Sequence, residues 1–126
     1  MNATRTFPHR PESITRARRF VNDALEDVPP KLRDIVVLMV SELATNCIRH
    51  TKSGFELTLR QTGEEIFVEA VDRGDGHPTM RTPAPTDPSG RGLQIIDIFS
   101  TTWGHENRPE GKAVWFSLSL ETATAA

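Results

Sequence analysis

The sequence predicts a two-layer α/β (α+β) sandwich, in which helices cover one face of a mainly antiparallel, mixed β-sheet. Three observations predict this fold class. Two long segments space their apolar side chains as helices do, and two shorter segments alternate apolar and polar side chains as half-buried strands do. A last strand-like pair closes the chain. The predicted elements are helices at residues 12–27, about 31–50 and 93–100, and strands at residues 55–61, 65–72, near 103 and at 113–120.

The sequence predicts one of the two long helices more clearly than the other. The helix over residues 12–27 has Ser13 as its expected N-cap, and Pro29 and Pro30 end it. The second contains the apolar run Ile35–Val40, which taken alone also fits a buried strand. No helix breaker follows for about 20 residues, which favours a helix from Lys31 to His50.

The two strands after the long helices form a predicted hairpin, joined by a turn over residues 62–64. In the second strand Ile66, Val68 and Ala70 share one face, and Asp72 has the same parity. The face that packs on the helices therefore ends in a carboxylate.

The remaining segments are shorter. Residues 77–89 hold four prolines, which exclude a helix or a central strand. Trp103 and Trp115 are expected to pack within the final hairpin. The whole chain, residues 1–126, is predicted to be a single domain, with residues 1–10 and 121–126 as flexible ends.

Composition excludes several function classes. A net charge of -2 and a pI near 6.1 argue against a protein that binds nucleic acid by neutralising phosphates. One cysteine excludes an internal disulfide, and the four histidines show no zinc-site spacing. No apolar run approaches the roughly 18 residues that cross a bilayer. We therefore expect a cytoplasmic protein with neither nucleic acid nor membrane as a partner.

Three motifs carry candidate chemistry. Glu42, Asn46 and His50 recur every four residues, so a helix places them in one polar stripe. The segment 71–76 ends a strand in D-x-G-x-G, and the segment 89–93 opens a helix with a glycine pair. Each motif has an ordinary alternative: a solvated helix edge, an acidic turn and a glycine-rich turn, respectively. Neither the P-loop motif nor the third glycine of a dinucleotide-binding fingerprint is present.

In this order, the three motifs resemble the N-box and the two glycine boxes of the GHKL ATPase superfamily, which has the Bergerat ATP-binding fold. The quoted stretches are "ELATNCIRH", "DRGDG" and "GRGLQII". The resemblance spans about Lys31 to Leu120, with residues 77–89 as a short ATP lid. Within the superfamily the chain is most similar to the bacterial anti-sigma factor serine/threonine kinases. Glu42 opens the N-box as in that group, and the chain lacks room for a dimerising helical hairpin that carries a phosphoacceptor histidine.

The resemblance implies a role for each motif residue. Asn46 would hold Mg²⁺, Asp72 would accept from the adenine amino group, and Glu42 would be the general base. The glycines and the arginine of the two boxes would shape the base pocket and surround the phosphates: Gly74, Gly76, Gly90, Arg91 and Gly92.

The chain also departs from the superfamily pattern. Members commonly have a threonine that helps to recognise adenine where this chain has Ala113, and losing that hydroxyl would weaken nucleotide affinity. Cys47, in place of the usual alanine, is expected to be a small buried hydrophobe. His50 is expected to pack or hydrogen-bond at the helix end.

The function that the resemblance implies is an ATP- and Mg²⁺-dependent serine/threonine protein kinase that acts as an anti-sigma factor. Its expected partners are a sigma factor and a small anti-sigma antagonist that it phosphorylates, and a homodimer is expected. Two alternatives stay open: a non-catalytic GHKL domain that binds a regulatory partner, and a plain ATPase or detached sensor-kinase domain.

Overall fold

The computed structural model describes residues 1–72, 91–109 and 111–120. Within them the elements follow in chain order: β1 (Asn2–Phe7), α1 (Glu12–Ala24), α2 (Pro30–His50), β2 (Phe55–Gln61), β3 (Glu65–Asp72), α3 (Arg91–Phe99), β4 (Thr102–Arg108) and β5 (Gly111–Ser119). The strands form one sheet in the order β1-β2-β3-β5-β4, and every described pair is antiparallel.

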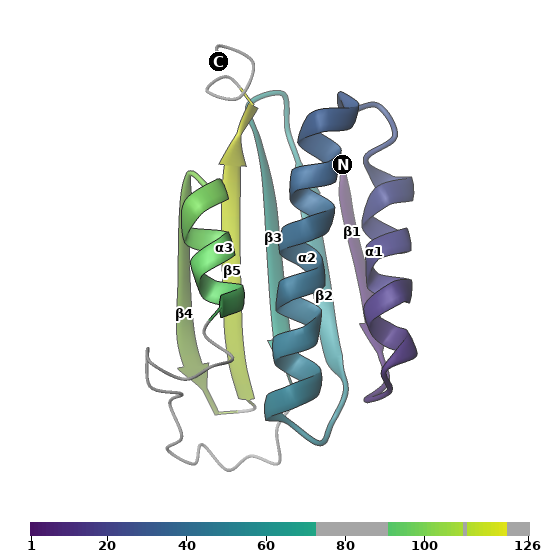
Figure 1. The fold of residues 1–126 in the computed structure, drawn as a ribbon, viewed down its shortest axis with the longest axis vertical. Coiled ribbons are helices and arrows are strands. Elements are labelled where there is room, and N and C mark those ends of the chain that lie inside the picture. The colour runs from purple at the N-terminus through teal and green to yellow at the C-terminus, as the bar shows by residue number, and fades with distance from the viewer. Residues whose placement is uncertain (73–90, 110, 121–126) are drawn as a thin grey trace.

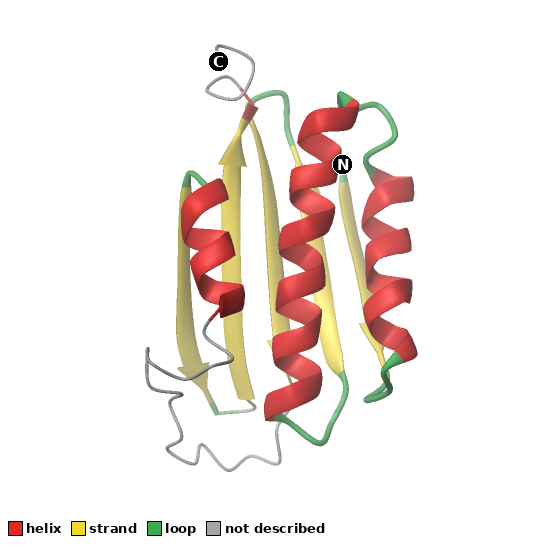
Figure 2. Ribbon diagram, in the orientation of Figure 1, coloured by secondary structure: helices red, strands yellow, loops and turns green. Residues whose placement is uncertain are grey.

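The helices lie on one face of this sheet, which confirms the predicted two-layer fold (Figures 1 and 2). The sheet was expected to be mixed, but no parallel pair occurs among the described strands. Within the same residues, none of the helices has the length and apolar content that a bilayer span requires.

The core lies between the two layers and follows the predicted alternation. Phe55, Leu57 and Leu59 of β2 and the equivalent positions of β3 are buried on the helix-covered face, against side chains of α2 such as Met39 and Leu43. Burying a side chain of this size contributes about 1.5–3 kcal/mol. The hydrophobic effect therefore fixes which face of the sheet the helices cover.

The N-terminal residues correct one prediction. Residues 1–10 were expected to be a flexible end, but Asn2–Phe7 form the edge strand β1, paired with β2. Phe7 is 2% exposed, and its ring stacks on Phe55 with 5.3 Å between the centroids. The segment contains one large apolar side chain, so it has no alternating pattern, and its strand depends on tertiary pairing.

The first helix also differs from the prediction in its ends. It begins at Glu12, directly after Pro11, and ends at Ala24 instead of residue 27. Ser13 is not an N-cap, because it lies inside the helix, buried, and its hydroxyl donates to the carbonyl of Pro8 at 2.6 Å. That bond ties the helix start to the turn that follows β1.

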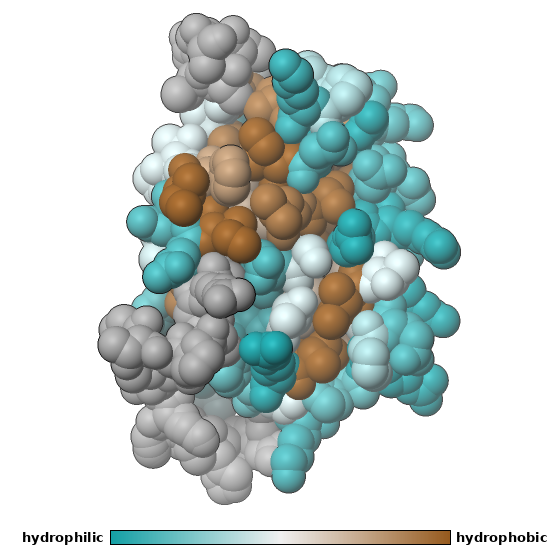
Figure 3. Space-filling model, in the orientation of Figure 1, coloured by the Kyte–Doolittle hydropathy of each residue, from teal (hydrophilic) through white to brown (hydrophobic). Residues whose placement is uncertain are grey.

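The second helix matches its prediction within a residue. Pro30 occupies its first turn, where the missing N–H costs nothing, and Arg49 and His50 stand in the last turn, where positive charge suits the helix dipole. On the surface above α2 and α3, apolar side chains gather towards the start of α2 and the end of α3 (Figure 3).

Candidate functional site

The second half of α2 carries the polar stripe predicted from the sequence. Glu42 and Asn46 are half-buried, and His50, at the helix end, is exposed. Leu43 and Cys47, the residues that follow the first two, are buried in the core. Residues four apart in a helix lie one turn apart on the same side. A rigid, core-packed helix thus holds a carboxylate and an amide side by side.

Asp72 ends β3 on the face that the helices cover, as its parity predicted. It is 7% exposed, and its Oδ1 accepts a hydrogen bond from the backbone N–H of Lys112 at 3.1 Å. Burial, and after it the charge of Asp72, raises the pKa of the Cys47 thiol. The strand that Asp72 ends, β3, contacts α2.

Three elements border the candidate site. In Figure 1 the end of β3 and the last turns of α2 lie in the lower part of the molecule, and α3 begins nearer to its middle, beside α2. Arg91 and Gly92 begin α3, and α2 packs against α3. A helix start exposes backbone N–H groups that favour anions. The candidate site therefore contains a carboxylate, an amide oxygen and the start of a helix.

Some predicted site residues lie outside the described residues. These are Gly74, Gly76, Gly90 and the proline-rich segment 77–89. Their predicted roles stay predictions.

Gly111, the first residue of β5, is a site residue that sequence reasoning missed. Its φ is +153°, and a Cβ built on it would lie 1.9 Å from the backbone oxygen of Asp72 and 2.9 Å from its Oδ1. Only glycine lets the two strands approach so closely here. The signal available in the sequence was a glycine directly before the residue that pairs with Asp72.

Gly111→Ala is expected to destabilise the fold by roughly 2–4 kcal/mol, because the methyl group meets backbone atoms of Asp72 in a strained conformation. Gly63→Ala is the matched control, because nothing lies within 4 Å of a Cβ there, and it should change stability by less than about 0.5 kcal/mol. Urea unfolding of both variants measures the difference. Equal stability would show that Gly111 does not constrain Asp72.

The register shows where Ala113 lies relative to Asp72. Ala113 pairs with Val71 and Glu106, and it lies on the face of the sheet away from the helices, outside the core cluster. Directly opposed residues of antiparallel strands share a face, so Lys112 is the residue of β5 that stands beside Asp72. A hydroxyl at position 113 would therefore lie on the face of the sheet opposite to the carboxylate of Asp72, and the expected effect on nucleotide affinity stays a prediction. Lys112 was missed because its face depends on the pairing register.

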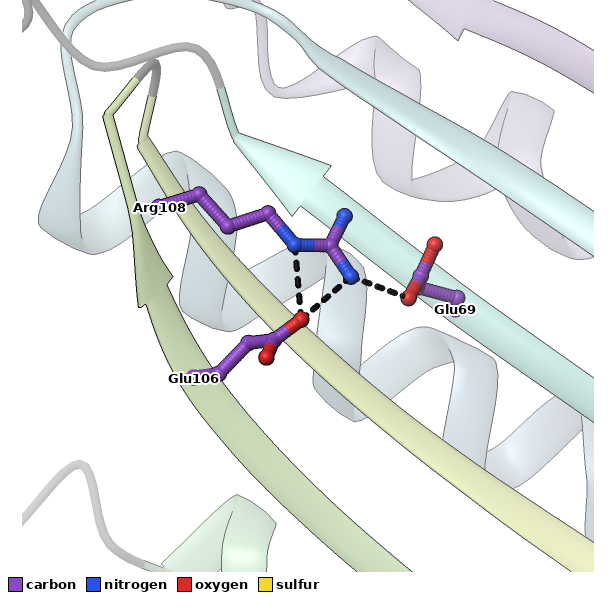
Figure 4. A network of polar contacts seen from close by, with 3 residues as sticks. All are labelled: Glu69, Glu106 and Arg108. Carbon is purple, nitrogen blue, oxygen red and sulfur yellow. Dashed lines mark hydrogen bonds and ion pairs between the residues drawn. The ribbon is translucent and has the colours of Figure 1, made fainter.

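A charge network braces the sheet on that open face, near the β4–β5 turn (Figure 4). The guanidinium of Arg108 donates from Nε to Glu106 at 2.8 Å and from a terminal nitrogen to Glu69 at 2.9 Å. These hydrogen bonds raise the pKa of Arg108. The network joins β4 to β3 across β5, and it stiffens the strands whose ends hold Asp72 and Lys112.

Trp103 and Trp115 pack within the final hairpin, as predicted. The Trp103 ring donates from Nε1 to Asp97 of α3 at 2.8 Å, which fixes α3 over the edge strand. Trp115 stacks on Phe67 on the open face, with 6.0 Å between the centroids.

The buried thiol of Cys47 supports a prediction. Because its pKa is raised in the folded chain, it stays protonated at pH values at which the unfolded thiol, with a pKa near 9.0, ionises. Stability should therefore fall as the pH rises above about 9, and Cys47→Ala should lose that part of the decrease. Urea titrations at pH 8 and pH 10 on both proteins measure it. Parallel decreases in the two proteins would contradict the assignment.

A comparison with models of protein families decides to which family the chain belongs. A family model described as "Histidine kinase-like ATPase domain" matches residues 7–118. The chain belongs to this family. A search of curated proteins found no match to it. Membership implies a site that binds and hydrolyses ATP, and the sheet with its helices is consistent with the Bergerat fold.

Domains of this family bind ATP with Mg²⁺, and the residues of this ATPase domain fit that ion. Mg²⁺ prefers oxygen ligands, and proteins commonly supply one or two of them while phosphates and water supply the rest. The side-chain oxygen of Asn46 would be a ligand of this kind. The described residues contain no cluster of three or more His, Cys, Asp or Glu side chains arranged for a metal.

Proposed function

We propose that this ATPase domain is a serine/threonine protein kinase that also acts as an anti-sigma factor. The observation that carries the proposal is the half-buried pair Glu42 and Asn46, one turn apart on α2. A proton acceptor beside an oxygen ligand suits phosphoryl transfer to a hydroxyl group. The nearly buried Asp72, at the end of the adjacent strand, supports adenine as the base.

In the proposed reaction, the Glu42 carboxylate takes the proton of the substrate serine. The serine oxygen bonds to the γ-phosphorus of ATP, and the bond from that phosphorus to the β,γ-bridging oxygen breaks, which leaves ADP. Mg²⁺, when bound, neutralises phosphate charge. Asn46 would hold the ion through its side-chain oxygen, and Asp72 would accept a hydrogen bond from the adenine amino group and so orient the nucleotide.

The proposed partners are a sigma factor, a small antagonist protein that receives the phosphate, and a second copy of the chain. Support for them comes from the motif resemblance to anti-sigma factor kinases. A half-buried Glu42 can also deprotonate water, so a plain ATPase is the second candidate.

The test is transfer of radiolabel from γ-labelled ATP to proteins that co-purify with the wild-type chain. The kinase proposal predicts a labelled small protein whose label survives acid, as phosphoserine does and phosphohistidine does not. Release of free phosphate with no labelled protein would identify a plain ATPase. Neither label nor phosphate release would leave a non-catalytic binding domain.

A further inference from the structure

Lys112, the second residue of β5, lies beside the buried carboxylate of Asp72. The two residues are directly opposed in the antiparallel pair of β3 and β5, so their side chains leave the sheet on the same face. The end of β3 and the start of β5 lie next to each other in the lower part of Figure 1. A hydrogen bond from the backbone N–H of Lys112 to Oδ1 of Asp72, at 3.1 Å, joins the two strand ends.

The face from which Lys112 projects is the one that the helices cover. Side chains alternate along a strand, and Lys112 has the parity of three core residues of β5: Val114, Phe116 and Leu118. The ammonium group therefore continues an apolar row towards the candidate site. Lys112 is half-buried, whereas the two other lysines of the chain, Lys31 and Lys52, are exposed.

The two side chains offer a ligand complementary groups. A carboxylate is a hydrogen-bond acceptor with about four acceptor positions, and an ammonium group has three donors and no acceptor. The backbone bond from Lys112 uses one acceptor position of Asp72. Among the residues that the structure describes, no hydrogen bond or ion pair engages the ammonium group. Asp72 and Lys112 thus place an acceptor and a donor side by side on one face.

The edge of adenine that carries the amino group matches this pair. The amino group is a donor, and the neighbouring ring nitrogen, N1, is an acceptor. Guanine has the reverse order at the same two positions, a carbonyl oxygen and an N–H group. Without Asp72, the ammonium group would suit the guanine carbonyl as well as N1 of adenine, so Lys112 adds selectivity only beside the carboxylate.

We propose that Lys112 is a specificity-determining residue of the nucleotide site, whose ammonium group donates a hydrogen bond to N1 of adenine while Asp72 accepts one from the amino group. This inference rests on the proposed binding of ATP with its base at Asp72. The bond from Lys112 to Asp72 comes from the backbone, so a substitution of the lysine side chain leaves that bond in place.

The test is isothermal titration with ATP and two analogues. In 1-deaza-ATP a C–H group replaces N1, whereas 7-deaza-ATP keeps both N1 and the amino group. The wild-type chain should bind 1-deaza-ATP at least about tenfold more weakly than ATP, because a hydrogen bond to a charged donor is lost. It should bind 7-deaza-ATP about as tightly as ATP. This comparison needs no substitution, so it tests the contact even if a variant fails to fold.

Three variants assign the contact to Lys112. Lys112→Met removes the donor from a side chain of similar length, so it should bind ATP at least about tenfold more weakly and should no longer distinguish ATP from 1-deaza-ATP. Lys112→Arg, which keeps a charged donor, should retain part of the discrimination. Lys31→Met, at the opposite end of α2 from the candidate site, is the matched control and should bind like the wild type.

The outcomes separate this inference from the proposed function. Equal losses of affinity for ATP and 1-deaza-ATP in Lys112→Met would show that the ammonium group does not act on N1, and would overturn the proposal. So would a Lys112→Met protein that binds ATP normally, or a wild-type chain that binds both nucleotides equally. A wild-type chain that binds no ATP would overturn this inference together with the nucleotide site. Discrimination as expected, without label transfer in the kinase assay, would support the role of Lys112 and contradict the kinase proposal alone.

Discussion

Glu42→Gln is expected to reduce phosphotransfer by about 10²–10⁴-fold and to leave nucleotide affinity nearly unchanged. The amide has almost the same shape as the carboxylate, but it cannot accept the proton of the attacking hydroxyl. Because Glu42 is only half-buried on a helix whose other side is core, the substitution leaves the packing intact. The measurements are initial rates of label transfer and an ATP titration of the same protein.

Two controls make this result specific. The thermal midpoint of Glu42→Gln should stay within about 2 °C of the wild type, which excludes unfolding as the cause. Glu42→Asp, which keeps a carboxylate on a shorter stem, should retain part of the rate. If Glu42→Gln transfers phosphate as fast as the wild type, the general base is another residue.

Asn46→Ala is expected to weaken Mg·ATP binding at least about 100-fold, because a direct metal ligand is lost. Asn46→Ala should therefore lower the affinity for Mg·ATP, whereas Glu42→Gln should lower the rate of phosphotransfer. Titrations with and without Mg²⁺ separate the two contributions. The loss should appear with Mg²⁺ present and largely vanish in EDTA.

Asn46→Asp is the matched control for that variant. It keeps a side-chain oxygen at the same distance from the backbone, so Mg·ATP should still bind. If Asn46→Ala and Asn46→Asp lose affinity equally, or if the loss persists in EDTA, Asn46 is a structural residue and not a metal ligand.

Much of the fold could be predicted because local patterns and the core agree. Apolar and polar side chains alternate strictly in β2 and β3, so one face of the hairpin is apolar and is buried. That face contains Phe55 and Ile66, and Asp72 lies on it at the end of β3. The stripe from Glu42 to Asn46 followed from helix periodicity alone. The positions of these residues follow from patterns within a single helix or hairpin.

The missed features depend on contacts between distant segments. Strand β1 forms because it pairs with the edge of β2 and because Phe7 stacks on Phe55. The sequence of residues 2–7 alone predicts neither contact. The positions of Gly111 and Lys112 beside Asp72 depend on the register of β5 against β3. The alternation of side chains within one strand does not predict that register. The same register places Ala113 on the face of the sheet away from the helices.

The site as a whole was predicted through motif order and not through geometry. The spacing between Asn46 and Asp72 in the sequence says nothing about distance in space. The structure supplies that link through the contact of α2 with β3, the strand that Asp72 ends. Lys112 adds a cation beside the predicted acceptor, on the helix-covered face.

The central claim is that the end of β3, the last turns of α2 and the start of α3 form an adenine nucleotide site. Isothermal titration of the wild-type chain with Mg·ATP and with Mg·GTP tests it most directly. An acceptor at Asp72 suits the amino group of adenine and not the carbonyl of guanine, and the loss of a hydrogen bond to a charged acceptor costs roughly 1.5–3 kcal/mol. ATP should therefore bind roughly ten- to a hundredfold more tightly, and Asp72→Ala should abolish the preference. No heat with millimolar Mg·ATP, or equal affinity for both nucleotides, would contradict the account.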